Sequence, residues 1–136
     1  MKLGLFLALM MPSSALAQQQ FPDAEEASPR QLYVACSLML TGDDLAEREV
    51  LGRYKPTSAP SCLAATIRAL ALGNGRNAEK PFRFCPSGSL DFDTDPPKAM
   101  ARAYVEYFEN AAPQIAKISG LAAFVLAQKE KWPCEQ

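Results

Sequence analysis

Four cysteines constrain this chain more than any other feature of its sequence. They are Cys36, Cys62, Cys85 and Cys134. An even number of cysteines in a small exported domain predicts a disulfide framework. No two of them form a Cys-x-x-Cys pair, so neither a zinc knuckle nor a thioredoxin-like redox site is indicated. The disulfide prediction therefore depends on whether the chain is exported.

The N-terminal residues predict export. Residues 1–17 read MKLGLFLALMMPSSALA, which is one positive charge, an apolar run and then small residues at Ala15 and Ala17. This order is typical of a secretory signal peptide, and the apolar run is shorter than the roughly 20 residues that a membrane-spanning helix needs. We expect cleavage after Ala17, a flexible polar N-terminus over 18–27 and a periplasmic location away from the membrane.

Because an exported protein reaches an oxidising compartment, we expect the four cysteines to form structural disulfides. Four cysteines allow three pairings, and the sequence alone leaves all three open. We favour the pairing of neighbours, Cys36 with Cys62 and Cys85 with Cys134. On the chain-entropy model these two links would stabilise the fold by about 3.5 and 4 kcal/mol.

The composition excludes several classes of function. The 136 residues include no histidine, which removes Ser-His-Asp and Cys-His catalysis and every histidine-ligated metal. The 14 Lys+Arg against 15 Asp+Glu form no basic surface for nucleic acid. We therefore expect a protein that is not an enzyme, holds no cofactor and binds another protein or a small ligand. A homodimer stays open.

Capping signals predict the first two helices. Ser28 is followed by proline and, three positions on, by Gln31, which is a capping box, and Gly42 is expected to end that helix. A second helix is expected over about 61–72, where Leu63, Ile67 and Leu70 fall in line. At most a short helix fits in the intervening 43–60.

Two further helices are expected near the C-terminus. One begins at Pro96 with Asp95 as its N-cap and is expected to break at Pro113. The last runs over about 120–131, capped by Ser119. No segment alternates apolar and polar residues as a half-buried strand would. The prediction is an all-α single domain over 28–136, with four to five helices stapled by two disulfides.

An acidic segment in the expected loop 76–97 is the candidate interaction site. Its D-x-D-x-D spacing is typical of the start of a calcium loop, but the sixth and twelfth positions hold proline and arginine where glycine and glutamate are required. No metal site is therefore expected. A solvated loop is one interpretation, and a partner-binding loop with an apolar anchor between acids is the other. The candidate partner-binding residues are Asp91, Phe92, Asp93 and Asp95.

The aromatic residues of the C-terminal half are expected in the core. Tyr104, Tyr107 and Phe108 lie at helical spacing, where core packing is favoured over a ligand-binding role. Trp132 is expected to pack beside the disulfide formed by Cys134.

The cysteine pattern of the chain resembles a known family. The resemblance is carried by Phe84-Cys85-Pro86, an acidic loop, a helix, Pro113 and a last helix that closes on Trp132-Pro133-Cys134. Together with the two upstream cysteines, this order is similar to the Rap/Tai family of type VI secretion immunity proteins. The likeness covers roughly 28–135, and 43–60 forms an insertion relative to it.

The resemblance implies a function. Members of this family are small exported helical proteins that bind a cell-wall amidase effector and block its active site. We therefore expect an immunity protein whose partner is a peptidoglycan amidase, with the loop at Asp91–Asp95 as its plug. A periplasmic acid-stress chaperone or a small-ligand-binding helical protein is the alternative.

Overall fold

The computed structural model describes residues 27–42 and 55–135. The predicted signal peptide 1–17, the polar N-terminus up to residue 26 and residues 43–54 of the predicted insertion lie outside the described residues.

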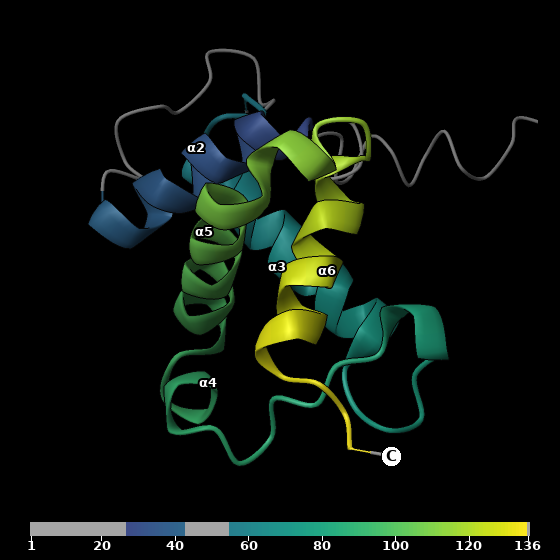
Figure 1. Ribbon diagram of the computed structural model, residues 1–136. Helices are drawn as coiled ribbons and strands as arrows, with labels where there is room; N and C mark the ends of the chain where they lie inside the picture. The colour runs from purple at the N-terminus through teal and green to yellow at the C-terminus, as the bar shows by residue number, and fades with distance from the viewer. Residues whose placement is uncertain (1–26, 43–54, 136) are drawn as a thin grey trace, which may run out of the picture.

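Helices make up the secondary structure of the described part of the chain (Figure 1). An isolated bridge between Asn74 and Phe84 is its only β-type pairing. The all-α prediction is therefore confirmed. The elements are α2 (Pro29–Thr41), α3 (Ala59–Gly73), the 3-10 helix η2 (Lys80–Phe82), α4 (Leu90–Thr94), α5 (Pro96–Ile115) and α6 (Gly120–Lys131).

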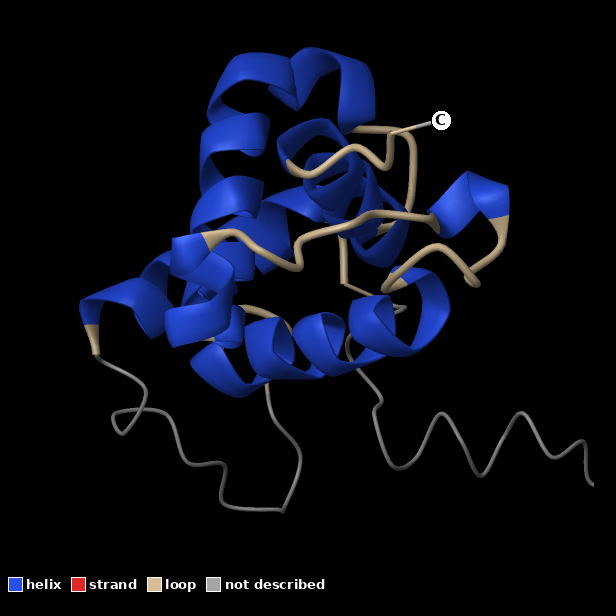
Figure 2. Ribbon diagram, turned by 90° about the horizontal axis from the view of Figure 1, so that it is seen from below, coloured by secondary structure: helices blue, strands red, loops and turns tan. Residues whose placement is uncertain are grey.

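The four long helices pack around one core. Helices α5 and α6 lie side by side, α3 crosses behind them, and α2 lies across one end and contacts all three (Figure 1). The short helix α4 sits at the opposite end of α5. Figure 2 shows the long irregular segment between α3 and α5 running over one side of the molecule. No helix in the described ranges is long and apolar enough to cross a membrane.

The helix starts follow the predicted capping signals. The backbone N–H of Gln31 donates to Ser28 Oγ at 3.1 Å, and the Ser28 N–H donates to Gln31 Oε1 at 3.0 Å, so the capping box is complete. Gly42 ends α2 with φ of 80°, a conformation that glycine adopts without steric cost. At α6, Ser119 Oγ accepts from the N–H of Ala122 at 3.1 Å.

Two predicted boundaries were wrong. Helix α5 does not break at Pro113 but continues to Ile115. A proline so close to a helix end removes one backbone hydrogen bond, and burial of Ile115, which is 3% exposed, favours continuing the helix. The expected loop 76–97 also contains two short helical turns, η2 and α4.

Both favoured disulfides are present. Cys36 pairs with Cys62, and Cys85 pairs with Cys134. The first joins α2 to the first turn of α3, and the second joins the irregular segment after η2 to the C-terminal residues. Because thiols stay reduced in most cytosolic compartments, two disulfides suggest an oxidising environment outside the cytoplasm.

The Cys36–Cys62 disulfide determines which side of α3 is buried. Because Cys62 faces α2, the small side chains at helical spacing from it, Ala65 and Ala69, are fully buried. The side marked by Leu63 and Ile67 faces outward, and these side chains are 43% and 48% exposed. Two of the three large apolar residues that the sequence places in line therefore lie on the outer side of this helix, and the third, Leu70, packs partly against the core.

Tyr104 lies at the centre of the core. Its side chain is fully buried, its ring centroid is 5.3 Å from that of Phe124, and its hydroxyl donates to the carbonyl oxygen of Pro29 in α2. Nearby, Gln128 Nε2 donates to the carbonyl oxygen of Met100 at 3.0 Å. The sequence prediction that Tyr104 belongs to the core is confirmed.

Replacing Gly73 by alanine should destabilise the protein although alanine favours helix. The new Cβ would lie 1.8 Å from the carbonyl oxygen of Phe82, so η2 would have to move. Crowding of this kind costs about 1–3 kcal/mol, more than the roughly 1 kcal/mol of helix propensity that alanine gains. Urea unfolding of Gly73→Ala measures the difference. A Gly73→Ala variant that is as stable as the parent protein or more stable would contradict the packing argument.

Replacing Tyr104 by phenylalanine should change how stability depends on pH. Burial raises the pKa of the Tyr104 hydroxyl above its usual value of 10. Above pH 10 the unfolded chain therefore loses this proton while the folded protein keeps it, and stability falls as pH rises. Tyr104→Phe should be about 1 kcal/mol less stable at pH 7, and this deficit should shrink between pH 10 and 11.5. Urea titrations across this range test it, and parallel stability curves for both proteins would contradict it.

Candidate protein-binding site

The acidic segment forms a fixed turn at one end of the molecule. Gly88 turns the chain with φ of 90°, and the N–H of Ser89 donates to the carbonyl oxygen of Pro86 at 3.0 Å. Helix α4 follows directly and leads into α5 through Asp95. This position puts the turn at the end of α5 that lies farthest from α2 (Figure 1).

The turn is fixed to the rest of the domain by the packing of Phe92 against Trp132 and by the Cys85–Cys134 disulfide. Phe92 meets Trp132 edge to face, with 5.7 Å between ring centroids, and the two side chains are 9% and 7% exposed. The carbonyl oxygen of Trp132 in turn accepts from the N–H of Cys85 at 2.8 Å. Because Cys85 is bonded to Cys134, Trp132 is held between two cross-linked segments, as the sequence predicted.

The expectation that Phe92 is an exposed apolar anchor was wrong. The Phe92 side chain is a core residue, and its burial is what fixes α4 to the domain. The exposed apolar residue of this turn is Leu90, with 80% of its side chain accessible. Residues two apart on a helix point about 200° away from each other, so burying Phe92 necessarily turns Leu90 outward.

Two of the three aspartates are exposed, and the third caps a helix. Asp91 and Asp93 are exposed on α4. Asp95 is half-buried, and its Oδ1 accepts from the N–H of Lys98 at 3.3 Å as the N-cap of α5. Asp95 thus has a structural role of its own, while the other two carboxylates are accessible to a partner.

The exposed part of the turn is suited to binding. We name Leu90, Asp91 and Asp93 the α4 knob. It combines one apolar side chain with two charges on a backbone that is fixed by Phe92, an arrangement typical of an interface anchor with a polar rim. Within 27–42 and 55–135, no group of three His, Cys, Asp or Glu side chains could hold a metal ion.

Sequence reasoning missed Leu90, although a signal for it was present. The periodicity of a five-residue helix is too short to show which side faces the core. The buried side is set by Trp132, which packs against Phe92. This contact forms only in the folded protein, because the two residues are far apart in the sequence. Helical spacing over residues 90–94 shows only that Leu90 and Phe92 point to opposite sides, so either could have been the exposed residue.

Comparison of the chain with protein-family models, with curated proteins and with solved structures finds no match. The family resemblance of the cysteine pattern therefore stays a prediction from the sequence.

Truncation of the two apolar residues of this turn should have very unequal effects on stability. Phe92→Ala removes a buried ring and its contact with Trp132, so we expect a loss of about 3 kcal/mol or more in the free energy of unfolding. Leu90→Ala changes an exposed side chain and should stay within about 0.5 kcal/mol of the parent protein. Thermal and urea unfolding measure both. A large loss in Leu90→Ala would show that Leu90 is packed and would remove it from the α4 knob.

Proposed function

We propose that this protein is an exported immunity-type protein that binds a peptidoglycan amidase effector of a type VI secretion system and blocks its active site. The observation that carries the proposal is the α4 knob, an 80% exposed leucine on a turn fixed by a buried aromatic pair and a disulfide. The order of cysteines and the terminal Trp-Pro-Cys support the family assignment. The disulfides and the N-terminal segment support a periplasmic location.

A fixed knob is what an active-site plug requires. Association is strengthened when the inserted segment has lost its conformational freedom before binding, because less entropy is lost on contact. Because Phe92 is already buried in the free protein, Leu90 is held outward before binding, and ordering this turn costs no further conformational entropy in the complex. Asp91 and Asp93 would then lie at the rim of the amidase cleft, where they would steer approach toward a positively charged opening.

The first test is genomic: the proposal expects a gene for a peptidoglycan amidase beside the gene for this protein, and that amidase, once purified, is the probe for the next measurements. The parent protein should inhibit release of soluble fragments from peptidoglycan and bind the amidase in calorimetry. Leu90→Asp places a charge where an apolar anchor is needed, and we expect affinity to fall at least 30-fold, as for a central interface residue. Asp91→Asn with Asp93→Asn should mainly slow association and weaken its salt dependence.

The matched control places the same charge on another face. Leu63 on α3 is 43% exposed, and Leu63→Asp should leave inhibition unchanged. Phe92 is kept in every variant, because its loss would unfold the turn. If Leu90→Asp inhibits as well as the parent, the knob is not the contact and 43–60 becomes the candidate. If the parent protein neither binds nor inhibits the amidase, the immunity function is wrong.

A further inference from the structure

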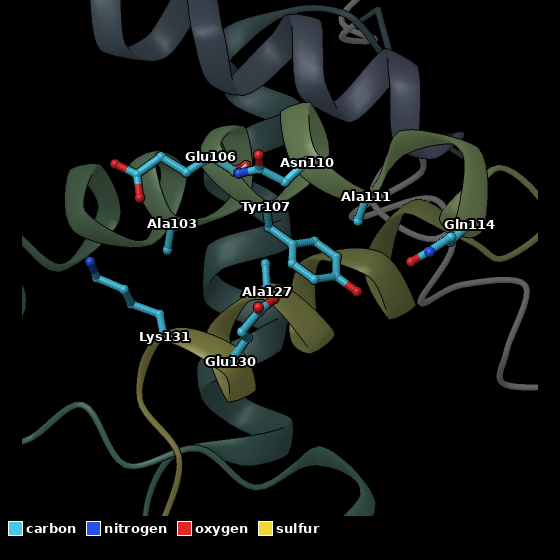
Figure 3. Close-up of a pocket in the computed structure, with 9 residues that line it drawn as sticks. All are labelled: Ala103, Glu106, Tyr107, Asn110, Ala111, Gln114, Ala127, Glu130 and Lys131. Atoms are coloured by element: carbon cyan, nitrogen blue, oxygen red, sulfur yellow. Dashed lines mark hydrogen bonds between the residues drawn. The ribbon is translucent and has the colours of Figure 1, made fainter.

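A groove between α5 and α6 forms a second surface that shares no residue with the α4 knob. It encloses about 530 Å³, a volume within the range of ligand-binding clefts. Figure 3 shows the ring of Tyr107 projecting from α5 across the groove toward α6, with Gln114 on the side of its hydroxyl and Lys131 at the other end. The residues that line it are Ala103, Glu106, Tyr107, Asn110, Ala111, Gln114, Ala127, Glu130 and Lys131.

The polar groups of the groove are left free by the fold. Asn110 Nδ2 donates to the backbone carbonyl oxygen of Glu106 at 2.8 Å, which holds the amide in place and leaves its Oδ1 as an acceptor. The structure shows no hydrogen bond or ion pair between the described residues and the carboxylates of Glu106 and Glu130. The hydroxyl of Tyr107 likewise has no partner among them. These groups can therefore bind a ligand without breaking an existing contact.

The charges in the groove favour a cation. The charged residues of the lining are Glu106, Glu130 and Lys131, so the lining carries one net negative charge, which one bound cation would neutralise. The partly buried ring of Tyr107 adds a face that attracts cations. Burial and the neighbouring Glu130 raise the pKa of Tyr107, consistent with a negative field around the ring. An anionic ligand would be repelled, and an apolar one would strip water from two carboxylates without compensation.

We propose that the α5–α6 groove binds the cationic side chain of a lysine or arginine in an extended peptide segment of a partner protein. The ammonium or guanidinium group lies between Glu106 and Glu130 with its alkyl stem along the ring of Tyr107. The amides of Asn110 and Gln114 receive the peptide backbone on either side, because side-chain amides both donate and accept hydrogen bonds. This proposal does not depend on the amidase or on the α4 knob.

The groove is tested by titrating the ¹⁵N-labelled, disulfide-bonded protein with acetyl-Gly-Lys-Gly-amide. Amide shift changes should be confined to α5 and α6. The control peptide replaces lysine by norleucine, which keeps the alkyl stem and removes the charge. We expect the lysine peptide to bind about tenfold tighter, the sum of a cation–π contact and two partly exposed charge pairs, and this preference should shrink at high salt.

Variants then test the assigned residues. Glu106→Gln and Glu130→Gln should each weaken the lysine peptide about twofold, and Tyr107→Leu should weaken it by a similar factor, so that the three effects together account for the tenfold preference. Glu79→Gln makes the same charge change on an exposed residue outside the groove and should have no effect. Equal binding of the norleucine peptide, unchanged affinity in both glutamate variants or shift changes outside α5 and α6 would each overturn the proposal. Equal binding of n-butylammonium, which keeps the charged lysine side chain and has no peptide backbone, would overturn the role of the peptide backbone.

Discussion

The Cys85–Cys134 disulfide is the constraint on which the end of the molecule that carries the α4 knob depends. The segment between α3 and α5 contains only short helical turns, and it is held in place by the burial of Phe84 and Phe92 together with this disulfide. The disulfide ties it to the C-terminal residues, and the hydrogen bond between Cys85 and Trp132 places the indole where Phe92 can pack. A short turn thereby becomes a rigid support for an exposed leucine.

The second disulfide has a different effect, because it sets the packing of the helices. Linking Cys36 to Cys62 presents the small residues of α3 to α2, and alanines at the contact allow the two helices to approach closely. The central Tyr104 then connects α5 to the start of α2 through its hydrogen bond with Pro29. The resulting core is small, so cross-links and precise contacts supply stability that a larger core would obtain from buried area.

The disulfide-linked helices present two exposed surfaces that differ in chemistry. At the end of α5, the α4 knob projects an apolar side chain flanked by carboxylates. Along α5 and α6, a groove is lined by an aromatic ring, two carboxylates and a lysine. A projecting group suits insertion into the cleft of a partner, whereas a recess suits a side chain that the partner inserts. Both surfaces rest on long, capped helices or on cross-linked turns, and so both are held in place before binding.

The sequence by itself determined the features that depend on local chemistry. The capping box at Ser28, the serine cap at α6 and the all-α class follow from residues close in the chain. The pairing of the four cysteines was favoured from the sequence, but the tertiary structure decided it among three possibilities. Only the tertiary structure decided which sides of the helices are buried. Leu63 and Ile67 look like core residues in the sequence yet face outward, and Phe92 looked like an anchor yet is buried. The physical reason is that the buried side of each helix is set by a contact with a remote segment, a disulfide for α3 and Trp132 for α4. The spacing of apolar residues within one helix does not reveal such contacts.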